Sequence, residues 1–103
     1  MAKLKLQPEP TFRAKVGIAV PGAAPVEVEF TFKYRNRDEV QAFIDASKER
    51  DNVATILEMC TGWELADAFD ADNVGTLALN YIAAPEAIFT TYLDELTKVA
   101  RKN

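Results

Sequence analysis

The sequence predicts an α+β fold in which an N-terminal β-hairpin is followed by three to four α-helices. Two observations predict it: apolar and polar residues alternate with period 2 through residues 11–34, and helical spacing replaces this alternation after Tyr34. With 103 residues, 49% of them hydrophobic, the chain can bury one modest core and is expected to form a single domain, 1–103. We divide it into an arm (1–10), the hairpin (11–34) and a helical part (36–103).

The hairpin is predicted from two amphipathic segments, 11–20 and 26–34, in which one face is apolar and rich in β-branched and aromatic residues. Between them, residues 21–25 contain two prolines and a glycine, which is typical of a turn. A lone hairpin is only marginally stable in water. Its apolar face is therefore expected to pack on the helices or to join strands of another subunit.

The first two helices are predicted from capping residues and from apolar residues spaced three and four apart. Asn36 is expected to cap a helix over about 38–50. Asp51 or Asn52 is expected to cap a second helix, which Gly62 would end. Cys60 falls on the apolar row of this second helix, where a buried, unreactive thiol is the expectation.

The last part of the chain predicts two more helices after a poorly periodic stretch. Residues 63–71 are expected to form a short helical turn or a loop. Asp72 is expected to cap a third helix with Ile82 on its apolar face. Pro85 suits the first turn of a last helix over about 86–101, which carries a wide apolar stripe.

Charge is segregated along the chain. Residues 51–97 contain nine acids and no lysine or arginine, whereas the first 37 residues contain seven bases and three acids. The net charge of −4 argues against free nucleic acid as a partner, because binding phosphates requires clustered Lys and Arg. An acidic run is most often only a solvated face, yet such segregation affects which protein partners a surface attracts.

Catalysis and metal binding find little support in the sequence. The absence of histidine excludes Ser-His and Cys-His pairs and removes the commonest metal ligand. Asp70 and Gly75 briefly resemble the start of a calcium loop, but Val74 and Tyr81 occupy positions where an EF-hand needs oxygen ligands. We therefore predict no enzymatic activity, no cofactor and no metal.

The compartment is predicted from three features. A lone cysteine cannot form an internal disulfide, which favours a reducing compartment. The basic N-terminus is not followed by the apolar run of a secretory signal. No segment approaches the roughly 20 apolar residues that a membrane span requires. The sequence predicts a cytoplasmic protein that does not bind membranes.

The candidate partner-binding residues lie mainly in 63–72, where acids and aromatics share one poorly periodic stretch. Aromatic side chains often anchor protein interfaces, and acids can steer basic segments of a client. Whether Trp63 and Phe69 belong to the core or to the surface stays open at this point. The predicted partner-binding set is Trp63, Glu64, Asp67, Phe69, Asp70, Asp72, Tyr81 and Tyr92.

Five segments carry a resemblance to a known family. They are MAKLKLQPEPTF (1–12), VEVEFTFK (26–33), RDEV (37–40), GWEL (62–65) and NYI (80–82). Across essentially its whole length the chain resembles the small tail assembly chaperones of long-tailed phages and prophages, the products made before a ribosomal frameshift.

This resemblance implies a non-enzymatic protein that binds the tape measure protein, keeps it soluble and helps tube subunits polymerise around it. Its partners would be the tape measure protein and possibly the tail tube protein, in the host bacterial cytoplasm, and it would be absent from the mature virion. Self-association, through the hairpin edge or the last helix, is a further expectation. Two alternatives remain: an acidic mimic of nucleic acid that binds a host factor, and a minor structural component of the tail.

Overall fold

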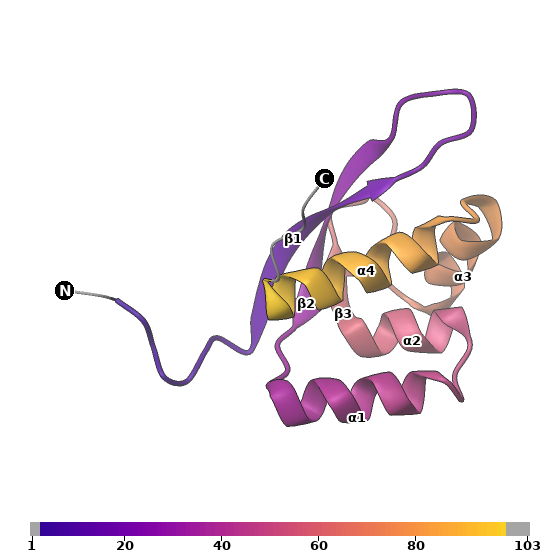
Figure 1. Ribbon diagram of the computed structural model, residues 1–103. Helices are drawn as coiled ribbons and strands as arrows, with labels where there is room; N and C mark the ends of the chain where they lie inside the picture. The colour runs from indigo at the N-terminus through magenta and orange to yellow at the C-terminus, as the bar shows by residue number, and fades with distance from the viewer. Residues whose placement is uncertain (1–2, 99–103) are drawn as a thin grey trace.

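A three-stranded antiparallel sheet in the order β1-β2-β3 carries four helices on one of its faces (Figure 1). This computed structural model describes residues 3–98. Its elements are β1 (Thr11–Ile18), β2 (Val26–Lys33), α1 (Arg37–Ser47), α2 (Asn52–Met59), β3 (Cys60–Trp63), α3 (Ala71–Asn80) and α4 (Ala84–Thr97). The predicted α+β fold, with an N-terminal hairpin followed by helices, is confirmed.

The hairpin forms as the alternation predicts. β1 and β2 pair in a continuous antiparallel register from Thr11 opposite Lys33 to Ile18 opposite Val26. In the loop, Gly22 has a φ of +78°, a conformation that glycine adopts without steric penalty. Alternate residues of both strands point toward the helices, and Val16 and Ile18 of β1 and Val28, Phe30 and Phe32 of β2 are buried there.

Two predicted helix starts are confirmed. The Asn36 side chain accepts a hydrogen bond from the Glu39 backbone N–H at 2.9 Å, and the Glu39 carboxylate accepts one from the Asn36 N–H, which makes a complete capping box. The Asp51 carboxylate accepts the Ala54 N–H at 2.8 Å and so caps α2. Helix α1 ends at Ser47, short of the predicted Arg50, because the chain tightens there into turns with i→i+3 hydrogen bonds.

The expectation that α2 runs on to Gly62 is wrong. The helix ends at Met59, and the next four residues leave it as β3, which pairs antiparallel with β2. Gly62 lies opposite Thr31, and Trp63 lies opposite Phe30. Trp63, which we expected in a helical turn or a loop, is therefore the last residue of a strand. Its pairing with β2 outweighs the weak secondary-structure preference of its own sequence.

The third and fourth helices differ from the prediction at their ends. Asp70, rather than Asp72, caps α3 by accepting the Asn73 N–H at 2.9 Å. Ile82 does not lie on an inner helical face: α3 ends before it, and it is 89% exposed. Pro85 does lie in the first turn of α4.

Helix α4 ends at Thr97. Lys98 follows in the left-handed region with a φ of 48°, and its N–H donates to the Asp94 carbonyl. The rest of the predicted last helix, 99–101, lies outside the described residues.

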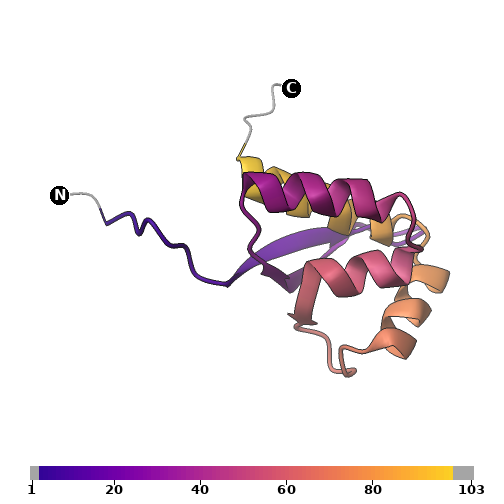
Figure 2. The ribbon, with the colours of Figure 1, turned by 90° about the horizontal axis from the view of Figure 1, so that it is seen from below.

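The core lies between the sheet and the helices and is centred on Tyr92 of α4. Its ring stacks on Phe32, with centroids 5.3 Å apart, and meets Phe43 of α1 edge-on at 5.6 Å. Phe43 is the one fully buried residue of α1. Helix α4 packs on β1 and α2 packs on β2 and β3. Seen from below, α1 lies in front of α4, and the N-terminal arm extends away from the fold (Figure 2).

Candidate functional site

Tyr92 is a core residue in this structure, although its aromatic ring made it a candidate for partner binding. It has no exposed surface. Its hydroxyl donates to the Lys33 carbonyl at 2.8 Å and accepts from Arg35 Nη1 at 2.8 Å. Burial raises the pKa of this hydroxyl, and the hydrogen bond from Arg35 opposes that rise. We therefore leave Tyr92 out of the candidate surface.

Trp63 and Phe69 lie at the boundary between core and surface. Both are half-buried. Trp63 meets Phe30 edge-on at 6.0 Å on its inner side and Phe69 at 5.1 Å on its outer side. The indole N–H donates to the Asp67 carbonyl at 2.7 Å, which holds the ring against the loop that follows β3. Trp63 and Phe69 thus each contribute to the core and to the surface.

Two of the four predicted acids have structural roles. The Glu64 carboxylate accepts the Glu29 N–H at 2.7 Å while the Glu64 N–H donates to the Glu29 carbonyl, so this side chain extends the β2–β3 ladder. Asp70 caps α3. Asp67 and Asp72 are exposed, and within residues 3–98 their carboxylates have no hydrogen-bond or ion-pair partner. These two remain available to a partner.

An apolar groove lies between the far end of the hairpin, the loop after β3, and α3. Its volume is about 380 Å³. It includes Trp63, Asp67 and Tyr81 of the predicted set, and no Lys or Arg lines it. The lining residues are Ile18, Val20, Val26, Val28, Trp63, Leu65, Asp67, Asn73, Thr76, Leu77, Asn80 and Tyr81. Below, "the groove" means this set.

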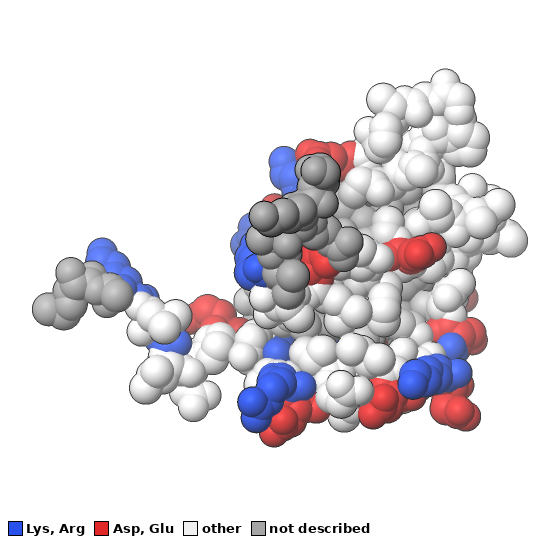
Figure 3. All heavy atoms as spheres, in the orientation of Figure 1, with Lys and Arg blue, Asp and Glu red and all other residues white. Residues whose placement is uncertain are grey.

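The surface around the groove is uncharged. Residues 18–26 and 73–85 contain no acid and no base, and the corresponding part of the molecule is white in Figure 3, in contrast to the charged surface along α1. Two large apolar side chains of the groove are exposed, Leu65 by 36% and Val26 by 53%, and the uncharged stretch 73–85 exposes two more outside its lining, Leu79 by 79% and Ile82 by 89%. The prediction from sequence missed these four residues, although the uncharged stretch 73–85 could have indicated two of them.

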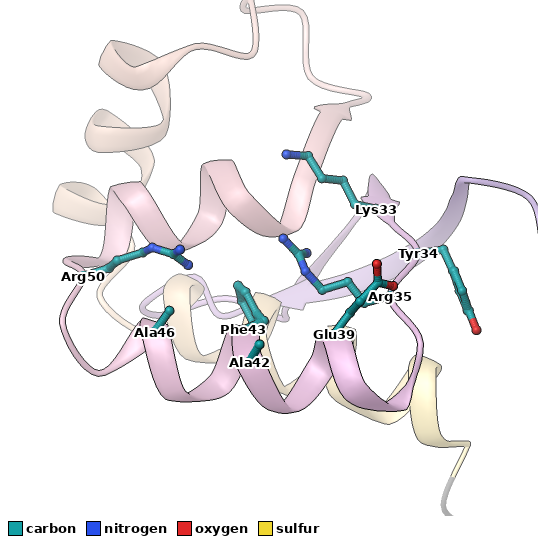
Figure 4. Close-up of a pocket in the computed structure, with 8 residues that line it drawn as sticks. All are labelled: Lys33, Tyr34, Arg35, Glu39, Ala42, Phe43, Ala46 and Arg50. Carbon is teal, nitrogen blue, oxygen red and sulfur yellow. The ribbon is translucent and has the colours of Figure 1, made fainter.

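A second hollow lies beside α1 and is basic. We call it the basic hollow; its volume is about 490 Å³. Figure 4 shows its lining residues, which are Lys33, Tyr34, Arg35, Glu39, Ala42, Phe43, Ala46 and Arg50. Three cations and one acid give it a charge opposite to that of the groove.

Arg35 is the central residue of the basic hollow, and its guanidinium is already engaged. Nη1 donates to the Glu58 carbonyl at 3.0 Å as well as to Tyr92, Nη2 lies 3.4 Å from the Glu58 carboxylate, and the group sits 4.6 Å above the Phe43 ring. Its side chain is only 16% exposed. Arg35 thus joins the start of α1 to α2 and α4, which is a role in folding.

The structure offers no sign of catalytic or metal chemistry in the part it describes. Burial raises the pKa of the Cys60 thiol to about 12, so at neutral pH the nucleophilic thiolate is scarce. Among residues 3–98, no cluster of three or more Cys, Asp or Glu side chains is arranged to hold a metal ion. Within the same residues, no helix is long and apolar enough to cross a membrane.

Comparison with known proteins supplies the family. A family model described as phage tail assembly chaperone matches residues 1–103, the whole length of the chain. The chain belongs to the phage tail assembly chaperone family. No curated protein and no solved structure matches it.

A chaperone of tail assembly works by contacting other proteins, and the two hollows differ in what they offer for that. The basic hollow of this chaperone is built around an arginine that the fold itself uses. The groove leaves apolar side chains and one acid, Asp67, without partners in the described chain. The groove, with Asp67 and Asp72 beside it, is therefore the candidate functional site.

Proposed function

We propose that this chaperone binds the tape measure protein through the groove and keeps apolar segments of that client out of water until the tail tube forms around it. The observation that carries the proposal is an apolar groove in an uncharged surface, with the exposed side chains of Val26 and Leu65 in its lining. Contiguous exposed apolar surface on a small domain marks interaction sites more often than chance. Membership of the tail assembly chaperone family supports the same role.

The chemistry of the groove suits an apolar client segment with basic neighbours. Trp63 and Tyr81 give it rigid aromatic walls that can pack against aliphatic side chains. Asp67 and Asp72 would attract lysines or arginines that flank such a segment, which raises the association rate more than the affinity. Recognition therefore depends on an apolar stretch with positive flanks rather than on one sequence.

Each copy would bind weakly, because one groove of about 380 Å³ takes only a few side chains. Many copies can bind along one long client, and they gain avidity only where they are joined to one another, so a single copy still dissociates quickly. Rapid dissociation lets tube subunits replace the chaperone without chemistry. The chaperone would thus act in the host cytoplasm, contact the tail tube protein during this exchange, and be absent from purified particles analysed by mass spectrometry.

Co-expression with the tape measure protein of the same phage tests the proposal. Wild-type chaperone should keep this client in the soluble fraction and co-purify with it. Asn80→Lys places a cation in the groove at an exposed position at the end of α3, so it should abolish rescue without unfolding the chain. Gln41→Lys adds the same charge on exposed α1 and is the matched control.

The result that contradicts the proposal is equal client solubility with wild type, with Asn80→Lys and with no chaperone at all. A second comparison tests the acids. Asp67→Asn combined with Asp72→Asn should weaken co-purification and make it less sensitive to salt. Asp70 stays unchanged in this variant, because it caps α3.

A further inference from the structure

The N-terminal arm is exposed throughout its described length. Every residue from 3 to 10 is exposed, and the arm leaves the fold at the start of β1 (Figures 1 and 2). Leu4 is 85% exposed and Leu6 is 92% exposed. In an extended segment these two leucines lie on one side while Lys3 and Lys5 lie on the other. The arm therefore presents an apolar side with the positive charge of Lys3 behind it, while Lys5 is paired with Glu9 of the arm itself at 2.6 Å.

We propose that the arm of one copy binds in the groove of a second copy. The groove is apolar enough to take Leu4 and Leu6, and it is lined by an acid and by no base. Asp67, the acid of the groove, would face Lys3. This complementarity follows from the charge segregation of the chain, since residues 51–97, which include α3 and the loop before it, contain no Lys or Arg.

The arm cannot place its leucines along the hairpin wall of its own groove. A hydrogen bond from the Tyr34 N–H to the Pro10 carbonyl, 2.8 Å long, fixes the base of the arm beside the start of β1. From Pro10, a fully extended chain reaches about 14 Å to Leu6 and about 22 Å to Leu4. The hairpin wall begins at Ile18, about 27 Å along the strand from Pro10.

The base of the arm is also confined. Helix α4 packs along β1, and its C-terminal end lies beside the base of the arm (Figure 1). An arm from another copy meets neither obstacle, because it can enter from solvent. The groove is therefore expected to be filled by a second molecule.

Arm exchange would give the chaperone a way to cover its apolar surface before a client arrives. The docked arm shields the groove, and a longer apolar segment of a client displaces it by mass action. Only this displacement step rests on the proposed function; binding of the arm does not.

Self-association of the full-length protein without any client tests the inference. Trp63 is the single tryptophan and lines the groove, so its fluorescence reports on the groove alone. Sedimentation and Trp63 emission should change together as the protein concentration rises. Leu4→Ser combined with Leu6→Ser should weaken the association at least about tenfold and abolish the change in emission.

Three controls separate loss of the arm contact from loss of stability or of a leucine in general. The arm variant should keep the wild-type melting temperature, because the side chains of Leu4 and Leu6 are almost fully exposed. Leu79→Ser removes a leucine of similar exposure that does not line the groove, and it should associate like wild type. Asn80→Lys should weaken association as the arm variant does.

A mixing experiment shows whether the contact joins two copies. The arm variant keeps an intact groove and Asn80→Lys keeps an intact arm, so an equimolar mixture should form heteromers although neither variant associates alone. A monomeric wild type, or an arm variant that associates as tightly as wild type, overturns the inference. If Asn80→Lys loses the client but associates normally, the arm inference fails while the proposed function stands.

Discussion

The basic hollow and the groove are of similar volume, about 490 and 380 Å³, but they are opposite in chemistry and in how far the fold itself uses them. In the basic hollow, Arg35 makes hydrogen bonds to two elements and packs over an aromatic ring. In the groove, apolar side chains remain exposed and the one acid, Asp67, has no partner in the described chain. Arg35 of the basic hollow thus holds the fold together, whereas the apolar lining of the groove is left exposed.

The comparison also changes the meaning of the acid-rich stretch 51–97. Several of its acids cap helices or complete the sheet, as Asp51, Glu64 and Asp70 do. The feature that points to a partner is the uncharged stretch 73–85 and the apolar residues beside it.

The largest loss of stability is expected at the basic hollow. Arg35→Met removes the hydrogen bonds to Glu58 and Tyr92 and the contact with Phe43. We expect it to lower the free energy of unfolding by about 2–3 kcal/mol, measured by urea denaturation. Arg37→Met is the control, because that side chain is 94% exposed and its ion pair contributes little. If both substitutions lower the free energy of unfolding equally, the contacts of Arg35 do not stabilise the fold more than those of an exposed arginine.

A smaller loss is expected when only the hydroxyl beside Arg35 is removed. Tyr92→Phe keeps the ring stacking but loses the hydrogen bonds to Arg35 and to the Lys33 carbonyl, so it should lower stability by about 1–2 kcal/mol. Tyr34→Phe removes a hydroxyl from a partly exposed ring and should leave the urea midpoint unchanged. A neutral Tyr92→Phe would show that water replaces both bonds.

Alkaline pH should weaken the core through two groups. Burial raises the pKa of Cys60 from 9.0 to about 12 and that of Tyr92 above 10.0. Both groups therefore hold their protons more tightly in the folded state, so their contribution is complete below pH 9 and is lost as the pH rises toward 12. We expect about 1 kcal/mol of stability to be lost between pH 8 and pH 10. Cys60→Ala should flatten this decline, whatever its effect at neutral pH, and an unchanged slope would contradict the assignment.

The smallest change in stability is expected at the groove. Asn80→Lys adds a favourable charge at the end of α3 and removes no buried contact, so its free energy of unfolding should stay within about 0.5 kcal/mol of wild type. The same variant is expected to lose client rescue. If Asn80→Lys unfolds the protein, the groove is needed for stability, and the two hollows do not differ in the way described above.

The sequence predicted the elements whose signals are local. Alternation over eight residues is enough to mark β1 and β2, and Asn36 and Asp51 cap their helices through bonds three residues away. β3 could not be predicted in the same way. Four residues are too few to show period 2, and their strand conformation depends on pairing with β2, far away in the sequence.

The candidate site was predicted only in part for a similar reason. The stretch 63–72 does supply Trp63 and Asp67 to the groove. Helical spacing showed that Tyr92 lies on an apolar row, but not that this row is the one that packs on the sheet. The hairpin wall of the groove was missed because only the tertiary structure brings residues 18–28 beside α3.

The loop between β3 and α3 has a further consequence, because both of its ends are fixed. At one end, Glu64 binds the Glu29 backbone through its side chain and its own N–H. At the other, Asp70 caps α3, and Asn73 donates from its side chain to the Ala68 carbonyl at 2.8 Å. This wall is therefore in place before anything binds, and little conformational entropy is lost on binding. Such a groove selects by width rather than by adapting its shape, so it can take up and release many different segments of one long chain at similar rates.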